Sequence, residues 1–362
     1  MKFTTDAKEF TKACNEVVSA VGLKSQFPAL TGIRLDLKND ILTLTGYDLE
    51  LGISAQLPVT GEEDGSIVTN AANVFLSVMS KIAGNFEFST SGNEQIHLKS
   101  ESAKTVDLIG VSVLNYPSLP IFETSEYTEL DGEKLKEGIK SVSHAIDTNN
   151  IKPVFSGALF DIKGDVISLV TTNGISLASF EFAVKAKGKE NCVVPGKALK
   201  AISSLAEKSK SVKFSIEKSH AIFRNNGTTI ITRTIAGDFI NYERIFSAFD
   251  EAAEIEVDAE RTKEALELAS VFSTERDRAP VVVELTNSGI NYSLKSSVGN
   301  FETSVPCDGT ISFKTAFKPA NFLNAIKAAG DGKVKLLGCG AVKPFGIVND
   351  RGYKAAVMPV RL

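Results

Sequence analysis

The sequence predicts an α+β fold made of three similar domains, each with two helices packed on antiparallel sheets. Three observations support this prediction: a segment that recurs along the chain, apolar residues that alternate around two-residue turns, and amphipathic helices at matching places in each copy. A chain of 362 residues has room for two or three domains of ordinary size. With 43% hydrophobic residues it can also bury a core.

The recurring segment has the pattern of a β-hairpin. Residues 35–44 align without a gap on residues 160–169, which lie 125 positions further on, and residues 281–292 form a weaker third copy. Apolar residues alternate on either side of a two-residue turn in each copy. The turns are Asn39-Asp40, Gly164-Asp165 and Ser288-Gly289. The sequence therefore predicts three hairpins, each with one buried face.

A helix-like segment precedes each hairpin and starts at an aspartate, namely Asp6, Asp131 and Asp258. An aspartate at this position can accept hydrogen bonds from the free N–H groups of the first helical turn. The apolar residues that share one helical face are Phe10, Cys14, Val17 and Val21 in the first helix and Leu135, Ile139, Val142 and Ile146 in the second. We therefore expect amphipathic helices with one buried stripe.

A second type of helix follows each hairpin, at Asn73, Lys197 and Asn321, which are 124 residues apart. Each of these helices leads into a further alternating segment, at residues 86–88, 212–214 and 334–336. This spacing predicts that one helix, one hairpin, a second helix and more antiparallel strand make up each copy.

The ends of the copies also repeat, because Asn115-Tyr116 recurs as Asn241-Tyr242. Residues 117–126 and 246–253 are polar or rich in turn formers and are poor in strand pattern, so we expect them to connect the copies. The predicted domains are 1–122, 123–249 and 250–362.

Residue types that carry catalysis are sparse. The three histidines, His97, His144 and His220, lack the spacing of a metal motif, so we expect surface or capping roles for them. The four cysteines form no CxxC pair, and Cys14 lies on an apolar helical stripe, as a core residue would. A hydrolase or nuclease whose site assembles across the repeats is the enzymatic alternative, but no copy carries a metal-type cluster for it. The sequence favours a protein without catalytic residues, metal or cofactor.

No segment approaches the ~18 uncharged apolar residues that a membrane helix needs, and the N-terminus is polar. Together with the scattered cysteines, this favours a soluble cytoplasmic protein that binds no membrane.

Charge is unevenly distributed between the two helix types. The chain carries 40 Lys and Arg against 44 Asp and Glu, a net charge of −4. Residues 73–84, 196–210 and 318–333 together carry +6, whereas the helices that precede the hairpins are neutral or acidic. Two interpretations stay open: the lysines solvate exposed helix faces, or helices related by the repeat place positive charge along a phosphate backbone. The second interpretation requires a closed or curved arrangement.

The chain resembles the family of bacterial DNA polymerase III beta subunits, or sliding clamps. The resemblance runs in order along essentially the whole chain and is carried by Met1-Lys2-Phe3-Thr4, residues 42–50 with Thr45-Gly46-Tyr47-Asp48-Leu49-Glu50, and the terminal Val357-Met358-Pro359-Val360-Arg361-Leu362. It implies a DNA-clamp fold in which a head-to-tail homodimer closes six domains into a ring. Helices would line the hole around duplex DNA, and sheets would face outward.

The resemblance also implies a function without catalysis. The clamp would bind DNA without sequence preference and tether the replicative polymerase and other replication and repair proteins for processive synthesis. A separate clamp loader would open the ring. A divergent clamp homologue that serves a mobile element, a phage or a repair system is the alternative.

Partners of this family insert a short linear peptide into a hydrophobic groove between the second and third domains. The residues that match the groove are Phe155, Thr172, Gly174, Ile175, Leu177, Ile240, Arg244, Ile245, Met358, Pro359 and Val360. Ile175 and Ser176 replace a His-Arg pair that is common in the family, and Ile240 replaces a usual proline, which leaves the peptide preference open.

The same resemblance implies DNA contacts at Lys24, Asn149 and Lys197. It also implies a dimer interface in which the edge strand of the first domain joins the third domain. The residues concerned are Val106 and Leu108 on one side and Val271 and Phe272 on the other.

Overall fold

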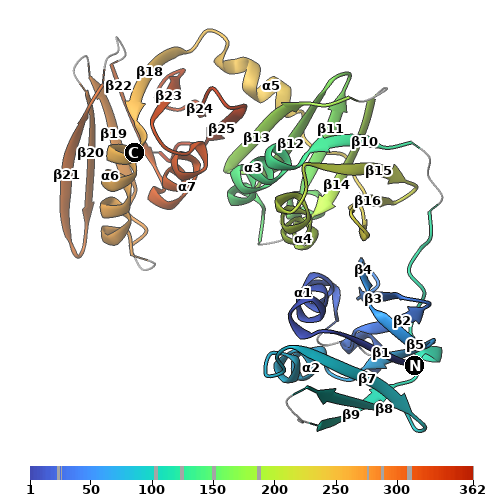
Figure 1. The fold of residues 1–362 in the computed structure, drawn as a ribbon. Coiled ribbons are helices and arrows are strands. Elements are labelled where there is room, and N and C mark those ends of the chain that lie inside the picture. Colours follow the sequence, from blue (N-terminus) through green and yellow to red (C-terminus); the bar gives the residue numbers. More distant parts are fainter. Residues whose placement is uncertain are drawn as a thin grey trace. The chain divides into compact units, whose positions relative to one another are not determined.

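The structure is a computed structural model that describes residues 1–22, 25, 27–101, 105–122, 126–148, 152–185, 189–274, 277–286, 289–307 and 312–361. Its fold is α+β, and the strands of all its sheets pair antiparallel (Figure 1), which confirms the predicted class. The contacts divide the chain into two compact units. The first contains residues 1–132 and 200–234, and the second contains residues 133–199 and 235–362.

The first unit is built on a sheet with the strand order β10-β15-β16-β17-β4-β3-β2-β6-β9-β8-β7-β1-β5. Its strands are β1 (Lys2–Asp6), β2 (Arg34–Lys38), β3 (Ile41–Tyr47), β4 (Leu51–Pro58), β5 (Thr60–Glu63), β6 (Gly65–Thr69), β7 (Asn85–Ser91), β8 (Gln95–Ser100), β9 (Thr105–Val111), β10 (Thr128–Asp131), β15 (Ser211–Glu217), β16 (His220–Asn225) and β17 (Thr228–Arg233). Its helices are α1 (Ala7–Val17), α2 (Ala72–Met79) and the part of α4 (Gly196–Glu207) from Lys200 onward.

The second unit contains two sheets, with the orders β14-β11-β12-β13-β25-β24-β23-β18 and β21-β20-β19-β22. Its strands are β11 (Gly157–Lys163), β12 (Val166–Thr172), β13 (Ser176–Ala183), β14 (Lys189–Pro195), β18 (Ala253–Asp258), β19 (Val281–Thr286), β20 (Gly289–Ser296), β21 (Gly299–Pro306), β22 (Phe313–Phe317), β23 (Lys333–Gly338), β24 (Phe345–Val348) and β25 (Tyr353–Val357). Its helices are α3 (Gly132–Val142, from Glu133 onward), α5 (Tyr242–Phe246), α6 (Ala259–Phe272) and α7 (Pro319–Ala329).

Short 3₁₀ helices complete both units. They are η1 (Val18–Ala20), η2 (Pro28–Thr31), η3 (Val113–Asn115), η4 (Ser143–Ala145), η5 (Pro153–Ser156) and η6 (Ser247–Phe249). Within the described ranges, no helix has the length and apolar character that a bilayer crossing requires.

The predicted hairpins form, and the same two-residue spacing closes each of them. The closing pairs are Lys38 with Ile41, Lys163 with Val166, and Thr286 with Gly289. Asn39 (φ 53°) and Gly164 (φ 68°) adopt the left-handed backbone that such tight turns need. The hairpins are confirmed, with two corrections. Gly289, predicted as a residue of the third turn, belongs to β20 and pairs with Thr286, while Ser288 lies outside the described residues. The second hairpin is buried on both faces and not on one, because β11 and β12 lie inside the sheet of the second unit.

The aspartates that precede the first helix type cap their helices where the hydrogen bonds are described. Asp6 Oδ1 accepts from the backbone N–H of Lys8 at 2.9 Å and of Glu9 at 3.1 Å. Asp258 Oδ1 accepts from the N–H of Arg261 at 2.9 Å. Asp131 ends β10 directly before α3. The sequence therefore identified where these helices begin.

The apolar stripe of the first helix is buried over its whole predicted length, from Phe10 to Val21. In the second copy Leu135, Ile139 and Val142 are buried, but Ile146 lies beyond α3, after η4, and is half-buried. In the first copy Val21 follows the equivalent 3₁₀ helix η1 and is 5% exposed, so the predicted stripe is fully buried there and only partly buried at its end in the second copy.

The core beneath α1 is aromatic. Phe10 of α1 packs edge-on against Phe86 at 5.3 Å and Phe75 at 6.0 Å between ring centroids, and Phe3 stacks on Phe88 at 4.9 Å. All five rings are at most 1% exposed. Buried rings in these geometries contribute about 0.5–1.5 kcal/mol per pair beyond their area. This packing fixes α1 on the sheet and leaves its opposite face to solvent.

The predicted surface role of His144 is wrong. Its imidazole is largely enclosed, and its Nε2 lies 2.9 Å from the hydroxyl of Tyr353 on β25. Burial lowers the pKa of His144 to about 4. Its sequence neighbours, Ser143 and Ala145, gave no sign of this environment because β25 lies more than 200 residues further along the chain.

Candidate nucleic-acid interface

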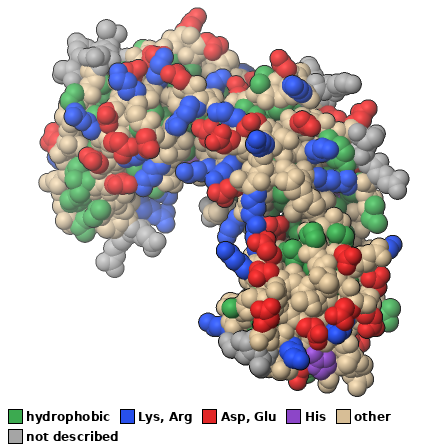
Figure 2. All heavy atoms as spheres, viewed as in Figure 1, with side chains coloured by type: hydrophobic (Ala, Val, Ile, Leu, Met, Phe, Trp, Pro, Cys, Tyr) green, Lys and Arg blue, Asp and Glu red, His purple; other side chains and the backbone are tan. Residues whose placement is uncertain are grey.

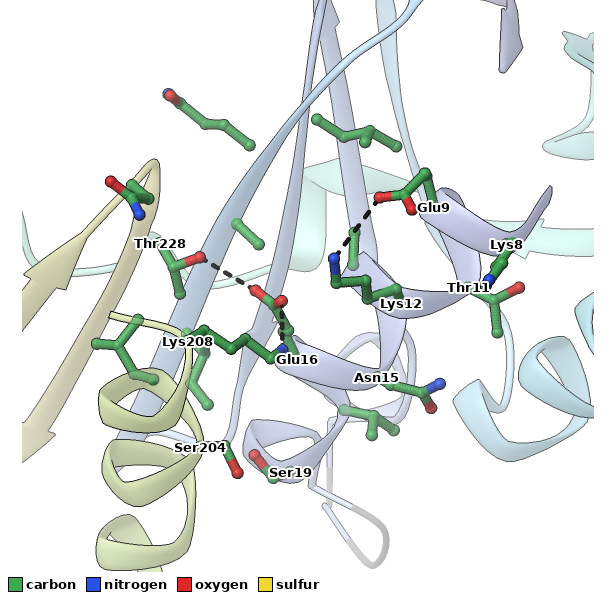
Figure 3. Close-up of a pocket in the computed structure, with 18 of the residues that line it drawn as sticks. Lys8, Glu9, Thr11, Lys12, Asn15, Glu16, Ser19, Ser204, Lys208 and Thr228 are labelled. Carbon is green, nitrogen blue, oxygen red and sulfur yellow. Dashed lines mark hydrogen bonds and ion pairs between the residues drawn. The ribbon is translucent and has the colours of Figure 1, made fainter. Parts of the chain in front are cut away.

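The exposed face of α1 carries polar side chains at helical spacing. Lys8, Lys12, Asn15 and Ser19 recur every three or four residues and are all exposed, opposite the buried stripe. Figure 3 shows these four side chains along one side of the helix and the turn that follows it. Two cations, an amide and a hydroxyl therefore line up on one surface.

The helix α4 repeats this arrangement. Lys197, Lys200, Ser204 and Lys208 follow at the same kind of spacing and are exposed, while Ile202 on the opposite side is buried. Lys197 lies at the start of α4, as predicted, and partial burial of its side chain lowers its pKa. The structure does not describe the other predicted DNA contacts, Lys24 and Asn149.

A cavity of about 1190 Å³ in the first unit lies between these surfaces of α1 and the C-terminal part of α4. Its basic lining residues are Lys8, Lys12, Lys200 and Lys208. Glu16 joins the two sides: its carboxylate lies 2.7 Å from Lys208 Nζ and accepts a hydrogen bond of 3.1 Å from Thr228 Oγ1 (Figure 3). Asp6, Glu9 and Glu207 also line the cavity, and Glu9 lies 3.8 Å from Lys12 Nζ, so carboxylates compensate part of the basic charge. The lysine, amide and hydroxyl groups are of the kind that contacts phosphate oxygens without reading base sequence.

The net charge of α1 gave no indication that its lysines share one exposed face. In the count for α1, Glu9 and Glu16 cancel Lys8 and Lys12. On the folded helix Glu9 lies 3.8 Å from Lys12, whereas Glu16 forms an ion pair with Lys208 across the cavity. The spacing of the lysines along the helix was the signal that could have found this surface. On the face seen in Figure 2, acidic and basic side chains are interspersed.

The predicted peptide-binding residues of the second unit converge on one apolar cluster. Leu177 is 4% exposed and packs in this cluster with Tyr242, and Ile240 and Ile245 pack against it from the side. Phe155 is also buried and meets Phe239, a neighbour of the cluster, edge-on at 6.1 Å. Segments that are far apart in the sequence thus form one apolar base.

A tight turn carries Thr172, Gly174 and Ile175 at the edge of this cluster. Thr172 Oγ1 donates to the carbonyl of Ser176 at 2.9 Å and accepts from the N–H of Gly174 at 3.1 Å. Gly174 has φ 83°, a backbone conformation in which a side chain would be strained. The turn leaves the side chain of Ile175 46% exposed.

The C-terminal segment lies beside this turn. The N–H of Met358 donates to the carbonyl of Ile175 at 2.9 Å, and the N–H of Val360 donates to the carbonyl of Ala316 at 2.8 Å. Met358 is 43% and Val360 39% exposed, while Pro359 is half-buried. The tail therefore adds exposed apolar side chains next to Ile175.

Polar contacts fix α5 beside the cluster. Asn241 caps the helix by accepting from the N–H of Arg244 at 3.1 Å, and the Arg244 side chain is exposed. The hydroxyl of Tyr242 donates to Asp161 Oδ2 at 2.6 Å, and Lys163 lies 2.9 Å from the same carboxylate. Burial and this hydrogen bond raise the pKa of Tyr242 to about 12. No group of three or more potential metal ligands occurs in the described part of the chain.

In the described structure, an unpaired strand edge contains the first two predicted dimer residues, Val106 and Leu108. Residues 105–109 of β9 pair with β8 on one side, and among the described residues no strand pairs with their other side. Val106 and Leu108 are half-buried there, and Ile109, which the sequence analysis did not single out, is 72% exposed.

The other predicted dimer residues lie at the end of α6, next to the outer strand β21. Val271 is 71% exposed, and the half-buried Phe272 stacks on Phe301 of β21 at 6.1 Å. β21 pairs only with β20 in the described sheet. Both sites thus combine an unpaired strand edge with apolar side chains, which is typical of surfaces that pair with another strand.

Comparison with known proteins gives consistent matches. Residues 1–120 match the family model of the DNA polymerase III beta subunit, N-terminal domain, and residues 129–241 match that of its central domain. Beta sliding clamps of Staphylococcus epidermidis and Staphylococcus aureus are each 24% identical to this chain, over 100% of it and 99% of the relative.

Solved structures agree over the full length. The DNA polymerase sliding clamp of Bacillus subtilis superposes with a TM-score of 0.93 at 23% identity, covering 100% of this chain and 99% of the other. The DNA polymerase beta subunit of Streptococcus pyogenes superposes with a TM-score of 0.93 at 21% identity, covering both chains completely. These structures establish the same fold.

Proposed function

Because the chain belongs to the DNA polymerase III beta subunit family, we propose that it is a replicative sliding clamp that encircles duplex DNA and tethers the DNA polymerase for processive synthesis. The lysine stripes of α1 and α4, which line one cavity, carry this proposal. Their contacts would be electrostatic and independent of base sequence, so the protein could move along the duplex. The clamp performs no catalytic step and needs no cofactor.

In this proposal the chain forms three domains, 1–122, 123–249 and 250–362, and two chains close head to tail into a ring of six. The free edge of β9 near Val106 and Leu108 would join the surface near Val271 and Phe272 of a second copy. The unpaired edges of β9 and β21 in the described sheets support this arrangement, since pairing them with each other would remove both at once.

Partner proteins would bind at the apolar cluster of the second unit through a short linear peptide. The exposed Ile175, Met358 and Val360 would contact the peptide, with Leu177 beneath. The polymerase catalytic subunit, a clamp loader and other proteins with the same motif are the proposed partners, in the cytoplasm. A clamp of a mobile element, phage or repair system is less favoured, since the similar proteins are bacterial sliding clamps and DNA polymerase beta subunits.

Retention on closed DNA tests the proposal. A clamp loaded onto a nicked circular plasmid should stay bound during gel filtration, whereas cutting the plasmid once should release it, because a ring can leave only over an end. Gel filtration of the free protein should give a dimer of about twice 38.8 kDa. Equal retention on circular and linear DNA, or an active monomer, would contradict encirclement.

A further inference from the structure

A second cavity of the first unit has a basic lining that the proposed ring does not use. Four fully buried side chains, Phe214, Phe223, Ile230 and Ile53, are successive cross-strand partners on β15, β16, β17 and β4. The adjoining row of partners is Lys213, Arg224, Thr229 and Ser54. Neighbouring residues of a strand point to opposite faces, so this second row lies on the face away from the core.

This second row lines a cavity of about 780 Å³, together with the loop after α4 and the turn between β16 and β17. Ile53 and Ile230, in contrast, line the first cavity, between α1 and α4. The two cavities therefore lie on opposite faces of the sheet. They share residues only near the strand ends, among them Lys208.

Four cations line the second cavity, and no carboxylate does. The cations are Lys208, Lys210, Lys213 and Arg224. The rest of the lining consists of hydroxyl and amide side chains, one glycine and the aromatic ring of Tyr127, with no aliphatic side chain. Such a lining offers hydrogen-bond donors to an anion and offers little to an apolar peptide.

Carboxylates of the described residues leave most of this charge uncompensated. Lys208 forms an ion pair with Glu16, but neither Lys210, Lys213 nor Arg224 forms one. The guanidinium of Arg224 donates to the hydroxyl of Tyr127 and, at 3.0 Å, to the carbonyl of Phe122, and both acceptors are neutral.

Neither the ring of Tyr127 nor the carboxylate of Glu129 neutralises the cations of the second cavity. Lys213 Nζ lies 5.9 Å and the Arg224 guanidinium 5.5 Å from the centroid of the Tyr127 ring. Glu129 is the cross-strand partner of Lys213 on β10, but it neither lines the cavity nor forms an ion pair with this lysine. Three cations held in one cavity repel one another, and an anion between them would offset this cost.

We propose that the cavity lined by Lys210, Lys213 and Arg224 is a phosphate-binding site. Ammonium and guanidinium groups with hydroxyl and amide donors are the set that recognises phosphate oxygens. The volume exceeds the needs of one phosphate ion and suits successive phosphates of a single nucleic-acid strand. Residues shared with the first cavity would let such a strand continue from one face to the other. The site is independent of ring closure, since the first unit alone forms it.

The test compares the full-length protein with the variant K210Q/K213Q. Both lysines line this cavity and not the first, and Arg224 is retained because it anchors Tyr127 and Phe122. Binding of a fluorescent single-stranded oligonucleotide is measured by anisotropy between 50 and 200 mM salt, and binding of tripolyphosphate by calorimetry. The variant should bind the oligonucleotide more weakly. Its slope of log affinity against log salt should fall by about 1.4, at ~0.7 per cation lost.

The variant K218Q is the matched control, because Lys218 is an exposed lysine at the other end of the same β15–β16 hairpin. It should bind both probes as the parent does. Loss of oligonucleotide binding in K210Q/K213Q alone supports a nucleic-acid strand as ligand, and loss of tripolyphosphate binding alone supports a free polyphosphate at the same site. Unchanged binding of both probes, or an equal loss in K218Q, would overturn the proposal.

Discussion

His144 is a single residue whose hydrogen bond links segments of the second unit that are far apart in the sequence. The hydroxyl of Tyr353 donates to the carbonyl of Ala325 on α7 at 3.1 Å, so the neutral imidazole donates from Nε2 to the same hydroxyl oxygen at 2.9 Å. Tyr353 is fully buried. This chain of hydrogen bonds connects η4, β25 and α7 through a neutral ring. Protonation would place a charge in a largely enclosed site.

The stability of the protein should therefore fall in mild acid. The folded pKa of His144, about 4, lies below the unfolded value near 6.5, so the unfolded chain binds the proton first as the pH falls. The free energy of unfolding should decrease through this window, by roughly 2 kcal/mol between pH 7 and 5 from this group. Urea unfolding of the parent and of H144Q at both pH values isolates the effect, because acidic groups contribute equally to both proteins. An identical pH dependence in the two would contradict it.

Ile175 is the exposed residue that best tests the peptide-binding surface. An aspartate there leaves the turn intact, because the hydrogen bonds of residue 175 use its backbone and because its side chain is half in solvent. I175D should bind a peptide from the C-terminus of the polymerase at least tenfold more weakly, since a charge then faces apolar side chains (~1.4 kcal/mol per tenfold). L114D, at a residue of the first unit that is 90% exposed, should bind normally in the same pull-down. Normal binding by I175D would argue for a different partner site.

At the scale of elements, local patterns carried most of what the sequence could predict. Alternation around Asn39 and Gly164 located the hairpins, and Asp6 and Asp258 located helix starts, because these signals act within a few residues. The pairing of β4 with β17, in which Ile53 faces Ile230, joins segments more than 170 residues apart. No local pattern encodes such a register.

The residues of the candidate site likewise differ in whether a local sequence pattern could predict them. The lysines of α4 were visible as a charge excess, but those of α1 were cancelled by neighbouring glutamates and appear only on the folded helix. The peptide-binding residues come from four separate segments. Leu177, Ile240 and Ile245 pack together in the structure. This convergence was predicted from family resemblance alone, because the sequence does not show which hydrophobic residues of distant segments will contact one another.

The exposed end of α6 is the element that should decide dimer formation. Val271 is 71% exposed on α6, so V271D should fold normally, yet it would place a charge in the proposed interface. Sedimentation equilibrium should show a shift from dimer toward the 38.8 kDa monomer. L114D, at a residue that is 90% exposed outside both strand edges, should remain dimeric. A dimeric V271D would place the interface elsewhere.

At the scale of the whole molecule, the compact units do not follow the sequence repeat. The repeat predicts three domains, whereas the contacts join residues 200–234 to residues 1–132, because β17 continues the sheet through β4. Likewise β25 continues the sheet of the second unit through β13, where Leu177 pairs with Ala356. Strand pairing across the repeats therefore organises the chain into two units, each with its own core.

These two units should unfold as separate cooperative blocks. Chains with more than one core commonly depart from a single transition, and backbone amides that share a sheet open together. Hydrogen exchange in increasing urea should show β4 and β17 losing protection in one event and β13 and β25 in another. Lowering the pH from 7 to 5 should weaken the second block more, since His144 lies there, whereas His220 of the first unit, whose pKa burial also lowers, is less enclosed. The contrary outcome is exchange of β17 together with β13. The sequence repeat would then define the cooperative unit, and the pairing of β17 with β4 would be too weak to join residues 200–234 to the first unit.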